Sequence, residues 1–151
     1  MMWKKMLRWA GPASVVMWLV ALAVFGARLP FYDQMRHPVS LLGATGVPGA
    51  GMFNAMGFVL PGLLAALAAL GLALRMPATA SRPLRVGAAR DAAWRPVATL
   101  AVACAVWMLC SAFVFGSVMP VAMAQRLAFL GWALWLATSS WLLPAGPRRR
   151  G

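Results

Sequence analysis

The stretch His37–Gly62 reads HPVSLLGATGVPGAGMFNAMGFVLPG and divides into two halves. Its first half, up to Met52, is dense in glycine and proline, which are turn and breaker residues. Its second half begins an apolar run that continues to Leu74, interrupted only by Pro61 and Gly62. A run of this length can cross a hydrocarbon core of about 30 Å as a helix. The stretch therefore predicts a loop that leads directly into a membrane span.

The composition extends this interpretation to the whole chain. Hydrophobic residues make up 63% of the 151 residues, and charged residues make up only 11%. In soluble domains, hydrophobic residues make up roughly 45–50% of the chain and charged residues about 25%. A surface as poor in charge as this one must face lipid. The net charge of +12 could indicate a nucleic-acid partner, but the basic residues lie in short clusters beside apolar runs, as topology signals do. We therefore expect one all-α integral membrane domain and no nucleic-acid partner.

Four apolar runs predict a bundle of four membrane-spanning helices in a single domain, residues 1–151. The predicted spans are about 12–28, 53–75, 96–118 and 127–143. The segments between them are a loop over 29–52, a basic connector over 76–95 and a tight turn near 119–125. In the second span, Pro61 removes one backbone hydrogen bond and should kink the helix. Small residues at nearly helical spacing in that span should let another helix approach closely. They are Gly62, Ala66, Ala69 and Ala73.

The distribution of basic residues predicts the orientation of the bundle. With the N-terminus in the cytoplasm and four spans, eleven of the 14 Lys and Arg residues fall on the cytoplasmic side. The three on the other side are Arg28, Arg36 and Arg126. This bias predicts a multi-pass protein of the bacterial inner membrane with both termini in the cytoplasm and 29–52 as the outer loop. A cleaved signal peptide is the alternative for the first span, but Phe25 stands where a cleavage site needs a small residue.

The outer loop and the start of the second span carry polar residues that membrane residence alone does not explain, so we expect the functional surface there. The candidate residues are Asp33, Arg36, His37, Ser40, Gly43 and Asn54. Asp33 and Arg36 are expected to form a local ion pair. Ser40 is expected to cap a short helix over 39–43. Asn54 is expected to hydrogen-bond a loop carbonyl.

Two kinds of ligand remain open at this loop. The glycine-rich turns between Gly43 and Gly51 precede a helix and could direct backbone N–H groups at an anion, for which a lipid headgroup is the best source on that side. A Cu(I) site is the second possibility, because thioether and imidazole ligands suit that ion. Its weak candidate ligands are Met35, His37, Met52 and Met56. One His, two Asp and no Glu do not supply the usual ligands of a catalytic metal, so we predict neither catalytic residues nor a cofactor.

Several ordered motifs lie close together in this region. They are YD at 32–33, HPVSLLGA at 37–44, GVP at 46–48, FN at 53–54 and GFVLPG at 57–62. Together they resemble domain-of-unknown-function family 998, whose members are prokaryotic multi-pass membrane proteins. The resemblance covers about 30 residues directly and implies a membrane location and a site in the outer loop, without naming a reaction. The chain departs from the family pattern near Leu41, where an acid commonly precedes the Leu-Gly pair, and members tend to have more spans, which implies a shortened bundle.

These observations lead us to expect a small, non-catalytic accessory or lipid-contacting component of the inner membrane. Its expected partners are membrane lipids, together with other membrane proteins or further copies of the chain. The alternative is a subunit of a membrane enzyme or transporter that uses residues 33–54. Proton-coupled transport is disfavoured, because transporters normally carry ionisable residues inside their spans and the predicted spans have none away from their ends.

Overall fold

The computed structural model describes residues 2–74, 95–139 and 141–142 of the chain. All regular structure in these ranges is helical, and four helices are long and apolar enough to cross a membrane. These candidate spans are Leu7–Arg28, Ala50–Ala73, Arg95–Val118 and Val121–Ser139. The predicted all-α class and the predicted number of spans are therefore confirmed for the described part of the chain. The basic connector up to residue 94 and the basic C-terminus lie outside the described residues.

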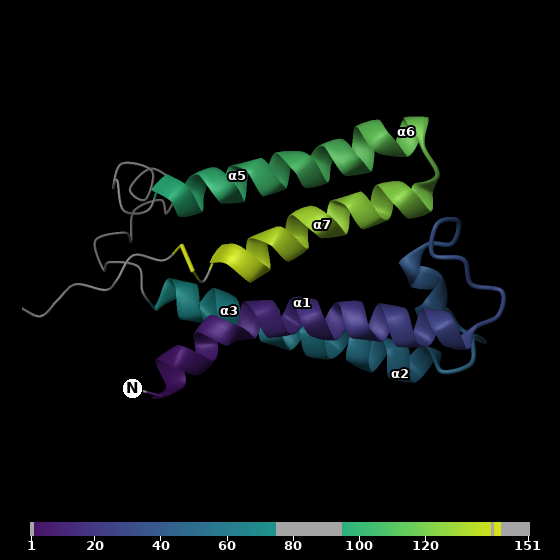
Figure 1. Ribbon diagram of the computed structural model, residues 1–151, viewed down its shortest axis with the longest axis horizontal. Helices are drawn as coiled ribbons and strands as arrows, with labels where there is room; N and C mark the ends of the chain where they lie inside the picture. Colours follow the sequence, from purple (N-terminus) through teal and green to yellow (C-terminus); the bar gives the residue numbers. More distant parts are fainter. Residues whose placement is uncertain (1, 75–94, 140, 143–151) are drawn as a thin grey trace, which may run out of the picture.

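The helices lie side by side, and α1 has the central place (Figure 1). The main helices are α1 (Met2–Arg28), α3 (Leu60–Ala73), α5 (Arg95–Cys110) and α7 (Val121–Ser139). Helix α1 packs against both α3 and α7, and α7 packs in turn against α5. Half of the most apolar window of the first span is buried, against 22% or less in each of the other three spans. Most residues of the second and third spans are exposed, whereas most residues of the fourth span are partly buried.

The two ends of the molecule carry different segments. Helix α1 begins and α7 ends at the same end, as an even number of antiparallel spans requires (Figure 1). The opposite end carries the segment 29–49 and the short turn before α7. We call this opposite end the loop end.

The second span is interrupted by a wide turn directly before its proline. It starts as α2 (Ala50–Asn54), passes through the π-helical turn η2 (Ala55–Val59) and continues as α3. Pro61 lies at the start of α3, so its missing N–H coincides with the change of helical register. The hydroxyl of buried Ser14 in α1 donates to the Pro61 carbonyl at 2.7 Å. The π-turn therefore ends directly before the position at which the sequence predicts a kink.

The row of small residues predicted to receive another helix lies on the exposed side of α3. Its four members, Gly62, Ala66, Ala69 and Ala73, are exposed. Helix α3 buries Pro61, Ala68 and Gly71 instead, and a Cβ added to Gly71 would lie 2.8 Å from the Cβ of Leu7. Because small residues occur on more than one face of this span, the sequence did not single out the face that packs within the chain.

The fourth span begins earlier than predicted, and this changes the position of one charge. The third span continues through the π-turn η4 (Ser111–Phe115) and α6 (Gly116–Val118), and α7 starts at Val121, directly after Pro120. The expected turn up to residue 125 is wrong, because the Pro120 carbonyl already accepts the first helical N–H groups of α7. Arg126 consequently lies in the second turn of α7, inside a candidate span. The expectation that no span carries an ionisable residue away from its ends is therefore wrong.

Candidate functional site

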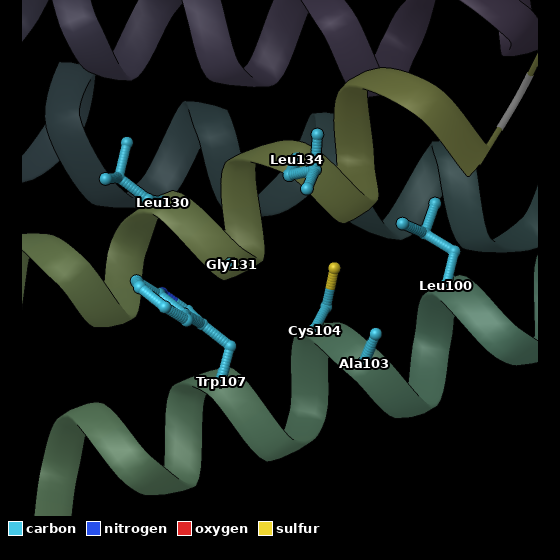
Figure 2. A pocket seen from close by; sticks show the side chains of 7 residues that line it. All are labelled: Leu100, Ala103, Cys104, Trp107, Leu130, Gly131 and Leu134. Atoms are coloured by element: carbon cyan, nitrogen blue, oxygen red, sulfur yellow. The ribbon is translucent and has the colours of Figure 1, made fainter.

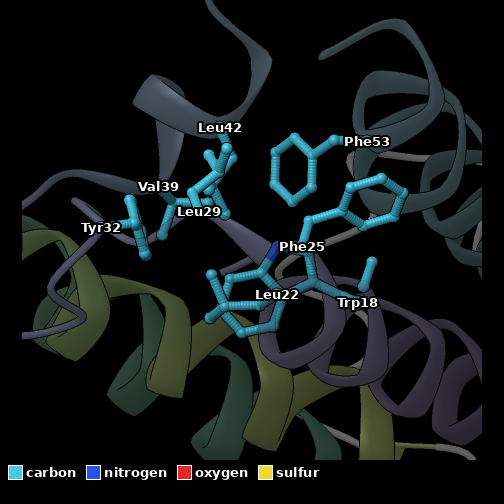
Figure 3. Packing of buried hydrophobic residues seen from close by; sticks show 9 residues of the cluster. Trp18, Leu22, Phe25, Leu29, Tyr32, Val39, Leu42 and Phe53 are labelled. Carbon is cyan, nitrogen blue, oxygen red and sulfur yellow. The ribbon is translucent and has the colours of Figure 1, made fainter. Parts of the chain in front are cut away.

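The segment between α1 and α2 is packed onto the end of α1 by an apolar core of its own (Figure 3). The buried cluster comprises Trp18, Ala21, Leu22, Phe25, Leu29, Tyr32, Val39, Leu42 and Phe53. Burial of a large apolar side chain contributes about 1.5–3 kcal/mol, and Val39, Leu42 and Phe53 are almost completely buried. The rings of Phe25 and Phe53 meet edge to face, with centroids 5.7 Å apart. The segment is therefore a structured cap on the bundle.

The predicted short helix is present with the predicted bounds, as the 3₁₀-helix η1 (Val39–Gly43). Its N-cap is Pro38, and the Ser40 side chain is exposed, so the capping role predicted for Ser40 is wrong. The side-chain amide of Asn54 donates to the Gly43 carbonyl at 3.1 Å, which confirms the predicted bond to a loop carbonyl. A Cβ on Gly43 would collide with the Asn54 amide. Asn54 and Gly43 therefore hold η1 against the second span.

The glycine-rich turns are closed by backbone hydrogen bonds of their own. Gly46 and Gly49 have positive φ angles of 87° and 81°, which only glycine adopts readily. The N–H groups of Val47 and Ala50 donate to carbonyls three residues earlier, each at 3.1 Å. These donors close the turns, so they are not directed at an anion as the sequence pattern allowed.

The tip of the loop consists of Asp33, Arg36 and His37. The predicted ion pair is present, with Arg36 Nε 3.6 Å from Asp33 Oδ2. Both side chains are strongly exposed, so the pair contributes at most about 1 kcal/mol. The second carboxylate oxygen of Asp33 accepts the N–H of Met35 at 2.7 Å, and the N–H of Asp33 donates to Nδ1 of His37 at 2.9 Å. The tip is therefore folded by bonds among its own residues.

Arg126 is a charged residue at the loop end that was not among the candidates predicted from the sequence. Its Nη1 donates to the carbonyls of Ala122, at 2.9 Å, and His37, at 3.1 Å. Its Nη2 donates to the Tyr32 hydroxyl and to Oε1 of Gln34, both at 2.9 Å. Three of the four bonds join α7 to the loop, and all four acceptors are neutral. The sequence did carry a signal, namely an arginine inside an apolar run. The predicted fourth span began at about residue 127, so Arg126 was assigned to the turn before it, whereas α7 begins at Val121.

Two glutamines complete the junction between the loop and the helices. Oε1 of Gln125 accepts the N–H of Val39 at 2.9 Å. The side-chain amide of Gln34 donates to the Leu22 carbonyl of α1 at 3.3 Å while its oxygen accepts from Arg126. Gln34 therefore connects α1, the loop and α7. We call Tyr32, Gln34, Gln125 and Arg126 the loop junction.

Tyr32, the only tyrosine in the chain, reports on this junction. Burial raises the pKa of Tyr32 above its usual value of 10.0, and the charge and hydrogen bond of Arg126 oppose that rise. We therefore expect tyrosinate absorbance to appear at a higher pH in the folded protein than in the denatured chain. Because the folded state holds this proton more tightly, its contribution to stability is present below about pH 10 and is lost as the pH rises through the folded-state value. Tyr32→Phe should abolish the signal, and titration at or below the denatured-state pH would contradict the burial of Tyr32.

The weak metal candidates have separate structural environments. Met35 and Met52 are exposed, whereas Met56 packs against the apolar core of the loop. Nδ1 of His37 already accepts an N–H. Within the described residues there is no group of three or more His, Cys, Asp or Glu side chains that could hold a metal ion.

Comparison of the chain with models of known protein families, with curated proteins and with solved structures gives no match. The resemblance to domain-of-unknown-function family 998 therefore stays a prediction.

Proposed function

We propose that this protein is a non-catalytic component of a bacterial inner membrane that acts through contact with membrane lipid. The observation that carries the proposal is the exposure of the second and third spans, of whose most apolar windows no more than 22% is buried. Their exposed side chains include Leu63, Leu67, Val102 and Val106. Apolar surface of this extent needs lipid or another membrane protein against it.

The polar residues at the loop end support a non-catalytic role. Asn54, Gln34 and Gln125 each bind backbone groups of neighbouring segments. Arg126 binds two carbonyls and two neutral side chains. These bonds fix the loop to the helices, so the role that they support for these groups is structural and not catalytic.

The orientation is part of the same proposal. The clustering of Lys and Arg supports an orientation with both termini in the cytoplasm and the loop end on the outer side of the membrane. The resemblance to prokaryotic multi-pass proteins agrees with this location. The second candidate function is that of an accessory subunit, in which a partner helix covers the exposed apolar faces.

Native mass spectrometry of the protein, extracted in mild detergent from its own membranes, tests the proposal. Phospholipid retained on the 16.1 kDa chain, or on multiples of it, is the expected result. A second polypeptide bound in fixed stoichiometry without retained lipid would support the accessory-subunit function instead. The bare chain, with neither lipid nor partner, would contradict both.

A further inference from the structure

The end of the molecule opposite the loop end, which we call the terminal end, carries an arginine in contact with two half-exposed tryptophans. Arg8 lies in the second turn of α1, and its guanidinium carbon is 5.4 Å from the ring centroid of Trp141, which follows α7. The rings of Trp9 and Trp141 meet edge to face, with centroids 5.1 Å apart. Trp9 is 57% exposed and Trp141 is 51% exposed. One basic and two aromatic side chains therefore join the start of α1 to the end of α7.

These three residues lie where the candidate spans begin and end. The first span begins at Leu7 and the fourth ends at Ser139. Arg8, Trp9 and Trp141 are each within two residues of these limits, and two residues extend about 3 Å along a helix. Tryptophan concentrates where the hydrocarbon core meets the headgroups, and arginine near the end of a span reaches the same level. The cluster thus lies at the depth of lipid phosphate groups.

The charge of Arg8 has no carboxylate partner in the described part of the chain. Asp33 is the only acid there, and it pairs with Arg36 at the loop end. The other acid of the sequence, Asp91, lies outside the described residues. Nε of Arg8 is buried and has no hydrogen-bond partner among the described residues. The cation–π contact with Trp141 supplies no acceptor, so these contacts leave both a charge and a donor unmatched.

The start of α1 adds positive charge and no negative charge. Lys4 and Lys5 precede Arg8 by four and three residues, so the three positions are neighbours along one helix surface. The first turn of α1 contains no acid. Basic residues without counter-charges at this depth favour an anionic lipid over a zwitterionic one. The planar guanidinium of arginine is also suited to binding phosphate oxygens in pairs.

The apolar groove between α5 and α7 has no comparable group (Figure 2). Its lining is aliphatic or aromatic apart from the Cys104 thiol. The indole N–H of Trp107 is already used, because it donates to the Leu127 carbonyl at 2.6 Å. Arg126 at the loop end is engaged as well, since its Nη atoms bind four neutral acceptors. An anionic group therefore finds its unmatched cation at the terminal end.

We infer that Arg8, Trp9 and Trp141 bind an anionic phospholipid, with its phosphate at the Arg8 guanidinium. The two exposed indoles contact the upper part of its acyl chains, because their rings lie where the hydrocarbon core begins. The guanidinium alone would suit any phosphate, whereas the indoles select one that carries apolar chains. This inference rests on the proposed function and deepens it by naming the lipid class and the site.

The test uses the full-length protein in detergent micelles doped with phosphatidylglycerol or phosphatidylcholine of identical acyl chains, and native mass spectrometry counts the retained lipid. One basic residue near an anionic surface predicts about a fivefold preference for the anionic lipid. Arg8→Gln should therefore lower the preference of the unchanged protein about fivefold. Trp141→Leu keeps the charge but removes the ring beneath it, so it should lower the preference in the same direction.

Arg95→Gln is the matched control. It removes a charge at the same end, from an exposed position where α5 begins and where the described residues give it no aromatic contact (Figure 1). The preference should fall by less than about twofold, because an exposed charge is screened by salt. Equal losses in Arg8→Gln and Arg95→Gln would show diffuse attraction to basic residues and would overturn the site.

Three further outcomes are decisive. Dependence on Arg8 that appears only after Asp91→Asn would make Asp91 its partner and overturn the lipid site. Inorganic phosphate should compete poorly, and competition as effective as that of phosphatidylglycerol would overturn the role of the indoles. An unchanged preference in folded Arg8→Gln and Trp141→Leu variants would reject the site while leaving general lipid contact intact. Retention of neither lipid by the unchanged protein would reject the proposed function as well.

Discussion

Replacing Gly11 with Ala should lower the unfolding free energy by about 1–3 kcal/mol, because it forces an extra carbon into a closed helix contact. Gly11 is buried in α1, and a Cβ there would collide with the backbone carbonyl of Leu136 in α7. A backbone atom cannot turn away as a side chain can, so the helices must separate. Separation is costly here because α1 is the helix that joins α3 to the pair α5–α7.

The measurement is thermal or denaturant unfolding in detergent, followed by circular dichroism. Gly62→Ala is the matched control, because a Cβ at Gly62 meets nothing within 4 Å and that position is exposed. Alanine has the better helix propensity by about 1 kcal/mol, so the control should be unchanged or slightly more stable. Equal destabilisation of the two variants would show that α1 and α7 do not meet at Gly11.

Replacing Arg126 with Met should release the loop from α7. The substitution removes the three bonds to the loop, which end on Tyr32, Gln34 and the His37 carbonyl. Hydrogen bonds to a charged group contribute about 1.5–3 kcal/mol each, so we expect a local loss of at least about 3 kcal/mol. Hydrogen–deuterium exchange of the loop amides should accelerate strongly, while exchange in the middle of α1 should change little.

Arg36→Met is the matched control for this experiment. It removes the same type of charge from the loop, but the Arg36 side chain is 84% exposed and contacts Asp33 only across 3.6 Å. Surface pairs of this kind contribute about 0–1 kcal/mol, so loop exchange should stay close to that of the unchanged protein. Unaltered exchange in Arg126→Met would show that Arg126 does not hold the loop, and the bond from Val39 to Gln125 would then be the contact that does.

The local features of the loop were predictable because their partners lie close in sequence. The pair Asp33–Arg36, the short helix Val39–Gly43 and the bond from Asn54 to a loop carbonyl join residues at most eleven positions apart. Short separations leave few alternative arrangements. The capping role of Ser40 failed because Pro38, with its extended backbone, already occupies the N-cap position.

The sequence by itself determined that this protein is helical and has four candidate spans, because the length and hydropathy of an apolar run are local properties. Only the tertiary structure decided which helix is central and where the loop attaches. The bonds from Gln125 and Arg126 to the loop join residues 86 to 94 positions apart. In a uniformly apolar helix several faces are equally suited to packing, so the choice among them depends on side-chain shape and on polar groups that meet only when the chain has folded.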